Sequence, residues 1–352
     1  MKRIVLTGGG TAGHVMPHFA LLPHLQQTGW EAHYIGTWDG IERELVGDDL
    51  PFYPISAGKF RRYFDLKNFT DPFRVLKGVG DSLRILRKIN PWVVFSKGGF
   101  VAVPVTIAAW MLRIPVVLHE SDLSLGLANR LSLPFSRALC VTFPESQERT
   151  KNAIVTGTPI RAEIGLGSRR AGLEFCRFSH QLPTLLVMGG SLGSAVLNEI
   201  VRVNLDELTA SYQIIHLCGR GNLADELKNP RYFQLEYARD ELPDLFAAAD
   251  FAISRAGANA IFELLALAKP HILVPLSLQA SRGDQILNAA SFARQGFSLV
   301  LQEEDLTLAA LREQLDGLRR QREKFVSTMR QSGLGDGTQN VLRIIEQVAA
   351  GR

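Results

Sequence analysis

Short apolar runs recur along the first half of the chain, separated by stretches whose apolar residues are spaced for one face of a helix. This alternation is typical of buried parallel strands joined by helical crossovers. The runs predict strands at 3–7, 32–35, 93–95 and 116–118. The first run leads into glycines and then into a helical pattern, so we expect a strand, a glycine loop and a helix to open the chain.

The same construction restarts past the middle of the chain. The run at 184–188 leads into a second glycine-rich turn and a helix through Leu197 and Ile200. We expect a surface loop around Arg169 and Arg170. Further strands are predicted at 213–217, 233–237, 251–254 and 271–274, and helices at 242–249, 259–268 and within 336–352.

Two such series predict an α/β fold of two Rossmann-like, doubly wound parallel-sheet domains. The length of 352 residues exceeds the usual size of one hydrophobic core, which agrees with two domains. Proline and glycine interrupt the pattern at 156–159. We therefore expect a first domain at 1–158 and a second at 159–335.

The composition is typical of a globular protein, with 46% apolar and 21% charged residues. The three cysteines lack the paired spacing of a zinc site, which suits a reducing compartment. We expect an intracellular protein without a membrane span, because the N-terminus lacks a secretory signal and polar residues interrupt the longest apolar region, 93–118. The net charge of +4 admits an anionic partner: nucleic acid, lipid headgroup or nucleotide.

The first glycine loop is a candidate site. Gly8, Gly10 and Gly13 satisfy G-x-G-x-x-G, and Asp39 follows the second strand, so a dinucleotide site is one interpretation. A diphosphate, a developing oxyanion or a tight turn without ligand would suit the same glycines. His14 begins the following helix, where the helix dipole favours a neutral imidazole that can accept a proton. The alternative is a histidine that only caps or packs there.

The second half offers two more phosphate-friendly turns, at 189–194 and 254–259, which together indicate a nucleotide. Glu263 lies about one turn into the helix that follows, where a carboxylate can bind both ribose hydroxyls. A partly buried salt bridge is the alternative role for Glu263. Polar side chains expected at the carboxyl edge of the sheet suit sugar hydroxyls, namely Asp284, Gln285 and Asn288.

Seven motifs, in order, give the chain a family resemblance that covers nearly its whole length. They lie at 9–15, 97–100, 114–120, 157–161, 189–193, 254–257 and 283–285. With these motifs the chain resembles the MurG family of peptidoglycan N-acetylglucosaminyltransferases, which have the GT-B fold of two domains facing across a cleft. The resemblance implies inverting transfer of N-acetylglucosamine from UDP-N-acetylglucosamine to the 4-hydroxyl of the undecaprenyl-linked muramyl-pentapeptide, lipid I, giving lipid II for cell-wall synthesis.

The resemblance also implies roles for individual residues. The C-terminal domain would bind the donor, the N-terminal domain would receive the acceptor, and the last helix would cross back onto the N-terminal domain. His14 would be the catalytic base, with Glu120 as rival or helper. No metal or cofactor is expected, since the chain has no Asp-x-Asp pair to hold Mg²⁺. Donor contacts would include Thr11, Ala12, Gly13, Arg161, Ser191, Glu263 and Gln285, and acceptor contacts Gly98, Gly99 and Asn129.

Residues 58–77 interleave aromatic residues with lysines and arginines, a mixture that suits an anionic membrane surface. Trp110 could extend this patch. We expect peripheral attachment to the cytoplasmic face of the bacterial cell membrane. Nucleic acid is not the expected partner, because no recognised nucleic-acid-binding motif accompanies the basic residues. Aromatic residues that fill the core of the first domain are the alternative.

Three rival functions stay open at this point. A different GT-B activity, such as a UDP-sugar epimerase or a transferase onto diacylglycerol, would share the donor site. An NAD-dependent oxidoreductase built on the first glycine loop would leave the loops of the second domain unexplained. A non-catalytic sensor of nucleotide sugars would retain donor binding and would be indifferent to His14→Ala and Glu120→Ala.

Overall fold

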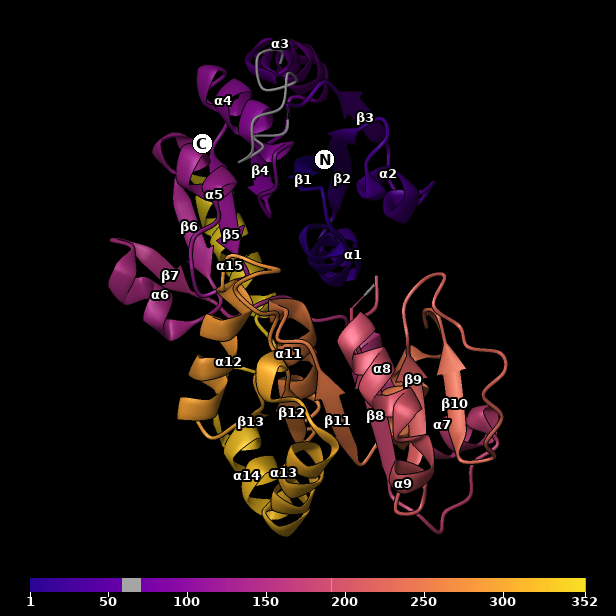
Figure 1. The fold of residues 1–352 in the computed structure, drawn as a ribbon. Coiled ribbons are helices and arrows are strands. Elements are labelled where there is room, and N and C mark those ends of the chain that lie inside the picture. Colours follow the sequence, from indigo (N-terminus) through magenta and orange to yellow (C-terminus); the bar gives the residue numbers. More distant parts are fainter. Residues whose placement is uncertain (59–70, 191, 352) are drawn as a thin grey trace. The chain divides into compact units, whose positions relative to one another are not determined.

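The structure is a computed structural model that describes residues 1–58, 71–190 and 192–351 (Figure 1). The chain divides into two compact units. Unit 1 comprises Met1–Arg161 together with Asp336–Arg352, and unit 2 comprises Ala162–Gly335. None of the described helices is both long enough and apolar enough to cross a bilayer.

Unit 1 is built on a seven-stranded sheet with the order β3-β2-β1-β4-β5-β6-β7, in which all neighbouring strands are parallel. The strand order reverses between β1 and β4, which is the position at which doubly wound sheets commonly bind their ligands. The four strands predicted for this half are confirmed. The strands are β1 (Lys2–Thr7), β2 (Trp30–Thr37), β3 (Phe52–Ile55), β4 (Val93–Ser96), β5 (Val116–Glu120), β6 (Ala138–Val141) and β7 (Ala153–Val155).

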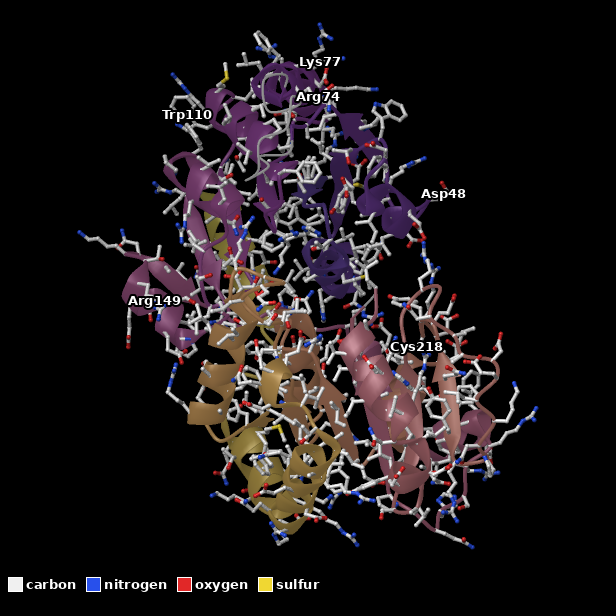
Figure 2. The ribbon with its side chains drawn as sticks, viewed as in Figure 1. Asp48, Arg74, Lys77, Trp110, Arg149 and Cys218 are labelled. Atoms are coloured by element: carbon white, nitrogen blue, oxygen red, sulfur yellow. The ribbon has the colours of Figure 1, made fainter. Side chains whose placement is uncertain are left out.

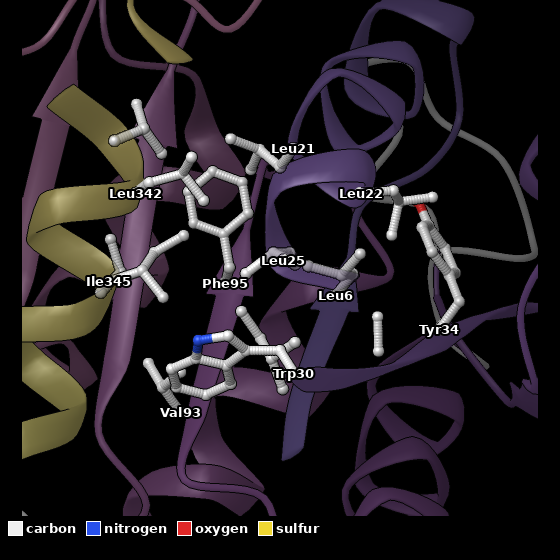
Figure 3. Packing of buried hydrophobic residues seen from close by; sticks show 14 of the residues in the cluster. Leu6, Leu21, Leu22, Leu25, Trp30, Tyr34, Val93, Phe95, Leu342 and Ile345 are labelled. Carbon is white, nitrogen blue, oxygen red and sulfur yellow. The ribbon is translucent and has the colours of Figure 1, made fainter. Parts of the chain in front are cut away.

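Helices cover both faces of this sheet. On one face, α1 and the C-terminal helix α15 pack against the strands, with Leu21, Phe95 and Leu342 in contact within one cluster (Figure 3). On the other face, α3 and α4 bury Leu86 and Val105 in a second cluster. The helices of unit 1 are η1 (Ala12–His14), α1 (Met16–Gln27), α2 (Ile41–Val46), α3 (Asp71–Ile89), α4 (Ala102–Met111), α5 (Leu127–Ser132), η3 (Leu133–Phe135), α6 (Pro144–Arg149) and α15 (Thr338–Ala350).

Successive side chains of β1 point to opposite faces of the sheet, which explains why the sheet has an apolar cluster on each face. Ile4 and Leu6 point into the first cluster, whereas Val5 between them points into the second. Because successive side chains of a strand point to opposite faces, a run that is apolar at every position needs cover on both sides. α15 supplies part of that cover with Val341, Leu342 and Ile345, which share one face of the helix.

Unit 2 repeats the construction with a six-stranded parallel sheet of order β10-β9-β8-β11-β12-β13. Its strand order reverses between β8 and β11. Its elements are η4 (Ala162–Leu166), α7 (Arg169–Cys176), β8 (Thr184–Met188), α8 (Ala195–Val203), α9 (Leu205–Thr209), β9 (Gln213–Leu217), β10 (Tyr232–Leu235), α10 (Leu242–Ala248), β11 (Phe251–Ser254), α11 (Ala258–Ala266), β12 (His271–Leu273), α12 (Asp284–Arg294), β13 (Leu299–Val300), η5 (Glu303–Asp305), α13 (Leu308–Arg320) and α14 (Arg322–Gln331).

The surface loop predicted around Arg169 and Arg170 is wrong, because both residues lie in the first turn of α7. Ser168 caps this helix, its hydroxyl accepting a hydrogen bond from the backbone N–H of Ala171. Leu173 is buried on the inner face of the helix. The capping serine and the buried Leu173 and Cys176 are the features of this segment that indicate a helix. The two adjacent arginines favoured the surface-loop interpretation instead.

Candidate active site

Three loops meet at the carboxyl edge of the sheet of unit 1, after β1, β4 and β5. Gly99 has a φ of +80°, and a Cβ there would lie 2.2 Å from the carbonyl oxygen of Gly9 in the first loop. Gly98 has a φ of +85°, and its Cβ would lie 3.1 Å from the side-chain amide of Asn129. Only glycine satisfies both the backbone conformation and the close approach. The predicted acceptor residues Gly98, Gly99 and Asn129 are therefore brought together beside the first glycine loop.

His14 is the last residue of η1 and is half-buried at this edge. Its Nδ1 lies 3.0 Å from the carbonyl oxygen of Gly9 and 3.1 Å from the hydroxyl of Thr11. Because a carbonyl oxygen can only accept, Nδ1 carries the proton of the neutral ring, and Nε2 presents a lone pair. Burial, reinforced by the positive charge of Lys97, lowers the pKa of His14 to about 4. The ring is therefore neutral at pH 7 and able to take a proton.

Glu120, at the end of β5, is also buried near Asn129. Its carboxylate accepts hydrogen bonds from the backbone N–H groups of Gly126 at 2.9 Å and Asp122 at 3.2 Å, and from the side chain of Asn129 at 2.9 Å. Burial, with the nearby charge of Asp122, raises the pKa of Glu120. The carboxylate thus ties the loop after β5 to the start of α5.

Sequence reasoning assigned no role to Lys97, which is buried just after β4. Its Nζ donates to Nδ1 of His119 at 2.7 Å and to the hydroxyl of Ser121 at 2.6 Å. The other ring nitrogen of His119 donates to the carbonyl oxygen of Gly157 at 2.9 Å. Burial lowers the pKa of Lys97 to about 7, although the charges of Glu120 and Asp122 oppose the shift. The only signal in the sequence was a lysine placed directly before two glycines.

Glu42 is a second buried charged residue of this site that sequence reasoning missed. It lies in the first turn of α2 and is fully buried under the first glycine loop. Its carboxylate accepts a hydrogen bond from the backbone N–H of Gly10 at 3.2 Å. Asp39, which the dinucleotide interpretation used, is exposed instead.

In unit 2 the glycine-rich turn after β8 is closely packed. A Cβ at Gly189 would lie 2.4 Å from the backbone nitrogen of Ser194, and one at Gly193 would lie 2.0 Å from the carbonyl oxygen of Cys218. Ser194 caps α8 by accepting a hydrogen bond from Leu197 N–H. The turn therefore delivers backbone amides to the carboxyl edge of the sheet. The predicted donor residue Ser191, within this turn, lies outside the described residues.

The second turn of unit 2 follows β11. Arg255 is buried there, donates to the carbonyl oxygens of Val274 and Pro275 at 3.2 Å each, and forms an ion pair with Glu303. These contacts join the loops after β11 and β12. Arg255 is thus engaged with protein groups, which leaves the first helical amides of α11 as the candidate anion-binding feature of this turn.

Three further predicted residues of unit 2 lie in the helices next to these loops. Gln285 is half-buried and accepts a hydrogen bond from Leu276 N–H at 3.1 Å, which fixes the loop after β12. Asn288 is buried and donates to the carbonyl oxygen of Ala256 at 3.1 Å. Glu263 is half-buried in α11, between two buried apolar neighbours.

The candidate residues thus fall into two groups. In unit 1, Thr11, Ala12, Gly13 and His14 form or adjoin the turn η1, and Gly98, Gly99, Glu120 and Asn129 line the neighbouring loops. Arg161 is the last residue of the first segment of unit 1. Glu263 and Gln285 belong to unit 2. In unit 1 the loop residues meet at the carboxyl edge of the sheet, and in unit 2 Gln285 binds the loop that follows β12.

Two doubly wound parallel sheets, each with glycine-rich loops where its strand order reverses, define a protein of the GT-B glycosyltransferase class. Residues 4–141 match the N-terminal domain of glycosyltransferase family 28, and residues 184–348 match its C-terminal domain. A crystal structure of Acinetobacter baumannii MurG is similar with a TM-score of 0.77 and 25% identity, covering 99% of this chain and 100% of that one.

Curated relatives match over almost their whole length. UDP-N-acetylglucosamine–N-acetylmuramyl-(pentapeptide) pyrophosphoryl-undecaprenol N-acetylglucosamine transferase of Clostridium perfringens is 54% identical over 99% of this chain and 98% of its own. The enzyme of the same name from Clostridium botulinum is 52% identical over 99% of each chain. The chain belongs to glycosyltransferase family 28 and, within it, to the family of these transferases, as its motifs predicted.

Proposed function

We propose that this enzyme transfers N-acetylglucosamine from UDP-N-acetylglucosamine to the 4-hydroxyl of the muramyl-pentapeptide in lipid I, giving lipid II. The observation that carries this proposal is the 54% identity with a transferase of that name over 99% of the chain. The identity extends through unit 1, the part in which transferases with a common donor would differ by acceptor. It therefore favours this acceptor over diacylglycerol and over an epimerase, which needs no acceptor.

In the proposed reaction, His14 is the catalytic base. The O–H bond of the acceptor breaks as its proton passes to Nε2 of His14, and the oxygen attacks C1 of the donor sugar from the face opposite UDP. The bond from C1 to the diphosphate oxygen breaks, and UDP leaves with the electron pair. One displacement inverts the anomeric centre and needs no covalent sugar-enzyme species.

The hydrogen bonds of the two candidate bases favour His14 over Glu120. His14 uses Nδ1 to bind Gly9 and keeps the lone pair of Nε2 for the substrate. The Glu120 carboxylate already accepts three hydrogen bonds from the loop and from Asn129. Taking a proton would weaken those bonds, so we assign Glu120 the task of holding the acceptor loop, with Gly98, Gly99 and Asn129 as acceptor contacts.

We assign donor binding chiefly to unit 2. The amides of the turn after β8 and of the start of α11 suit a diphosphate, because free N–H groups and the helix dipole favour negative charge. Glu263 would bind the ribose and Gln285 the sugar. Thr11, Ala12, Gly13, Arg161 and Ser191 stay predicted donor contacts by family resemblance. We expect no metal or cofactor to be required.

The rival dinucleotide interpretation of the first glycine loop fits the contacts poorly. A bound pyrophosphate would need the free N–H groups of the loop. The N–H of Gly10 is bound to the Glu42 carboxylate, whose buried negative charge would also repel a phosphate. This contact favours a role for the loop in positioning His14.

We propose that the enzyme attaches peripherally to the cytoplasmic face of the cell membrane through an apolar patch on α3, α4 and α5. Helix α3 contacts α4, and α4 contacts α5. Basic residues on α3, including Arg74 and Lys77, lie in the same region as Trp110 of α4 (Figure 2). Most of the predicted aromatic and basic stretch, 59–70, lies outside the described residues. The exposed apolar residues of the patch are Phe73, Leu76, Trp110, Met111, Leu127 and Leu131.

A transfer assay tests the proposed reaction. The protein is incubated with UDP-N-acetylglucosamine labelled in the sugar, lipid I and EDTA, with diacylglycerol replacing lipid I in a parallel reaction. We expect label in lipid II and none in diacylglycerol. Label in diacylglycerol, or a reaction that EDTA abolishes, would overturn the proposed acceptor or the proposed metal independence.

A further inference from the structure

The buried carboxylate of Glu42 is not explained by the proposed reaction, yet it lies directly behind the catalytic loop. It is fully buried, and no lysine or arginine is paired with it among the described residues. Three hydrogen bonds satisfy it instead. Oε1 accepts from the backbone N–H of Thr37 at 3.0 Å and from the Thr37 hydroxyl at 2.6 Å, and Oε2 accepts from the N–H of Gly10 at 3.2 Å.

Glycines make the room for this carboxylate. A Cβ at Gly9 or at Gly36 would lie 2.7 Å from the Glu42 side chain, and one at Gly40 would lie 2.3 Å from it. Real Cβ atoms essentially never approach so closely. Glycines from two segments of unit 1, the first glycine loop and the stretch from the end of β2 to the start of α2, therefore leave space around one side chain, which indicates a built position for Glu42.

The bonds of Glu42 and of His14 end on the same peptide group. The N–H of Gly10 and the carbonyl of Gly9 belong to one planar amide, and a trans amide points its N–H and its C=O in opposite directions. Glu42 accepts from the N–H side at 3.2 Å, and His14 Nδ1 donates to the C=O side at 3.0 Å. The carboxylate and the imidazole are thus linked through a single peptide group.

We propose that Glu42, the Gly9–Gly10 peptide group and His14 form a carboxylate–amide–imidazole relay in which Glu42 is the positioning residue of the catalytic base. This inference rests on the proposed role of His14. A negative charge at the N–H polarises the amide and strengthens its carbonyl as an acceptor, because hydrogen bonds in a chain reinforce one another. The stronger acceptor keeps the proton on Nδ1 and leaves Nε2 to the substrate.

The relay also acts while the proton moves. When the acceptor O–H breaks and its proton binds Nε2, His14 becomes an imidazolium, whose Nδ1–H donates to the polarised carbonyl of Gly9. In Ser-His-Asp enzymes a carboxylate contacts the imidazole directly and serves the same two purposes. Here the carboxylate stays beneath the loop, and no proton is transferred to it. The negative charge of Glu42 favours the protonated form of His14, which agrees in sign with its effect on the pKa of that ring.

The test compares Glu42→Gln with Glu44→Gln, the same substitution at an exposed position of the same helix. Glutamine cannot accept at both ends, so either the Gly10 or the Thr37 contact loses its acceptor, and the charge is gone. We expect kcat of Glu42→Gln to fall about 10-fold to 100-fold. The calorimetric Kd for UDP should stay within about twofold of wild type, because the diphosphate and ribose contacts assigned to unit 2 are untouched. Glu44→Gln should match wild type.

Thr37→Val provides a second variant that keeps the charge and removes one bond to it. We expect a smaller loss of kcat with the same unchanged UDP affinity. Wild-type kcat in Glu42→Gln, or a loss of kcat matched by an equal loss of UDP affinity, would overturn the relay. If Glu42→Gln does not fold, wild-type kcat in Thr37→Val would overturn it instead.

His14→Ala separates this inference from the function on which it rests. If wild type transfers no sugar, the proposed function is wrong. If His14→Ala keeps its turnover, the role of His14 as base is wrong and the relay falls with it. If His14→Ala loses turnover while Glu42→Gln and Thr37→Val keep theirs, only the relay is wrong.

Discussion

Replacing Gly99 by alanine should disturb the catalytic loop and unit 1 together. The new Cβ would lie 2.2 Å from the carbonyl oxygen of Gly9, so the two backbones must separate by on the order of 1 Å. The φ of +80° at Gly99 adds roughly 1 kcal/mol of strain for a residue with a Cβ. Overpacking against a backbone atom costs about 1–3 kcal/mol more. We expect unit 1 to lose about 2–4 kcal/mol of unfolding free energy.

Gly80→Ala is the matched control. Gly80 lies inside α3 without a positive φ, and no neighbouring heavy atom would lie within 4 Å of a Cβ at this position. Alanine there should stabilise the helix by about 0.5–1 kcal/mol. Both variants change one glycine of unit 1 into the same residue, with opposite predicted signs.

The assay is urea unfolding followed by tryptophan fluorescence. All four tryptophans, Trp30, Trp38, Trp92 and Trp110, belong to unit 1, so the signal reports this unit alone. Displacing the Gly9 carbonyl should also weaken its bond to His14 and lower kcat, while UDP affinity stays unchanged. If Gly99→Ala unfolds and turns over like wild type, the close packing of the two glycine loops is refuted.

Three further predictions address other parts of the molecule. Arg255→Gln should destabilise unit 2 by about 1–3 kcal/mol in denaturant unfolding, because the half-buried Glu303 carboxylate loses its charged partner; an unchanged midpoint would contradict this. Burial lowers the pKa of His18 to about 3 and that of His119 well below its usual value, so the unfolded chain binds more protons below pH 6.5. The stability of unit 1 should therefore fall as pH drops from about 6.5 toward 4, and a flat profile would argue against neutral buried rings. Trp110→Ala should weaken sedimentation with anionic vesicles, whereas Trp38→Ala, outside the patch, should not.

The strands that could be predicted from the sequence were those with continuous apolar runs, such as 184–188 and 251–254, which the structure reproduces residue for residue. β3 gave no such signal, since Pro54 interrupts it. Proline is tolerated there because β3 is at the edge of its sheet. β7 is only three residues long and half-buried, too short for a recognisable pattern.

The parts of the candidate site that could be predicted from the sequence are those formed by consecutive residues. The glycine loops and His14 lie next to strand ends, and parallel strands bring such ends to one edge. The position of Glu42 could not be predicted, because it depends on the close approach of Gly9, Gly36 and Gly40 to its side chain. No spacing of residues in the sequence indicates that approach. The contacts of Lys97 likewise depend on His119, which is 22 residues further along the chain but lies on the neighbouring strand β5.

We propose that His14 in unit 1 is the base and that unit 2 binds UDP. Comparing His14→Ala with wild type, by steady-state transfer to lipid I and by calorimetry with UDP on the same preparations, tests it most directly. We expect kcat to fall about 100-fold to 10,000-fold while the heat and affinity of UDP binding persist. Undiminished turnover in His14→Ala, or wild-type protein that does not bind UDP, would contradict it.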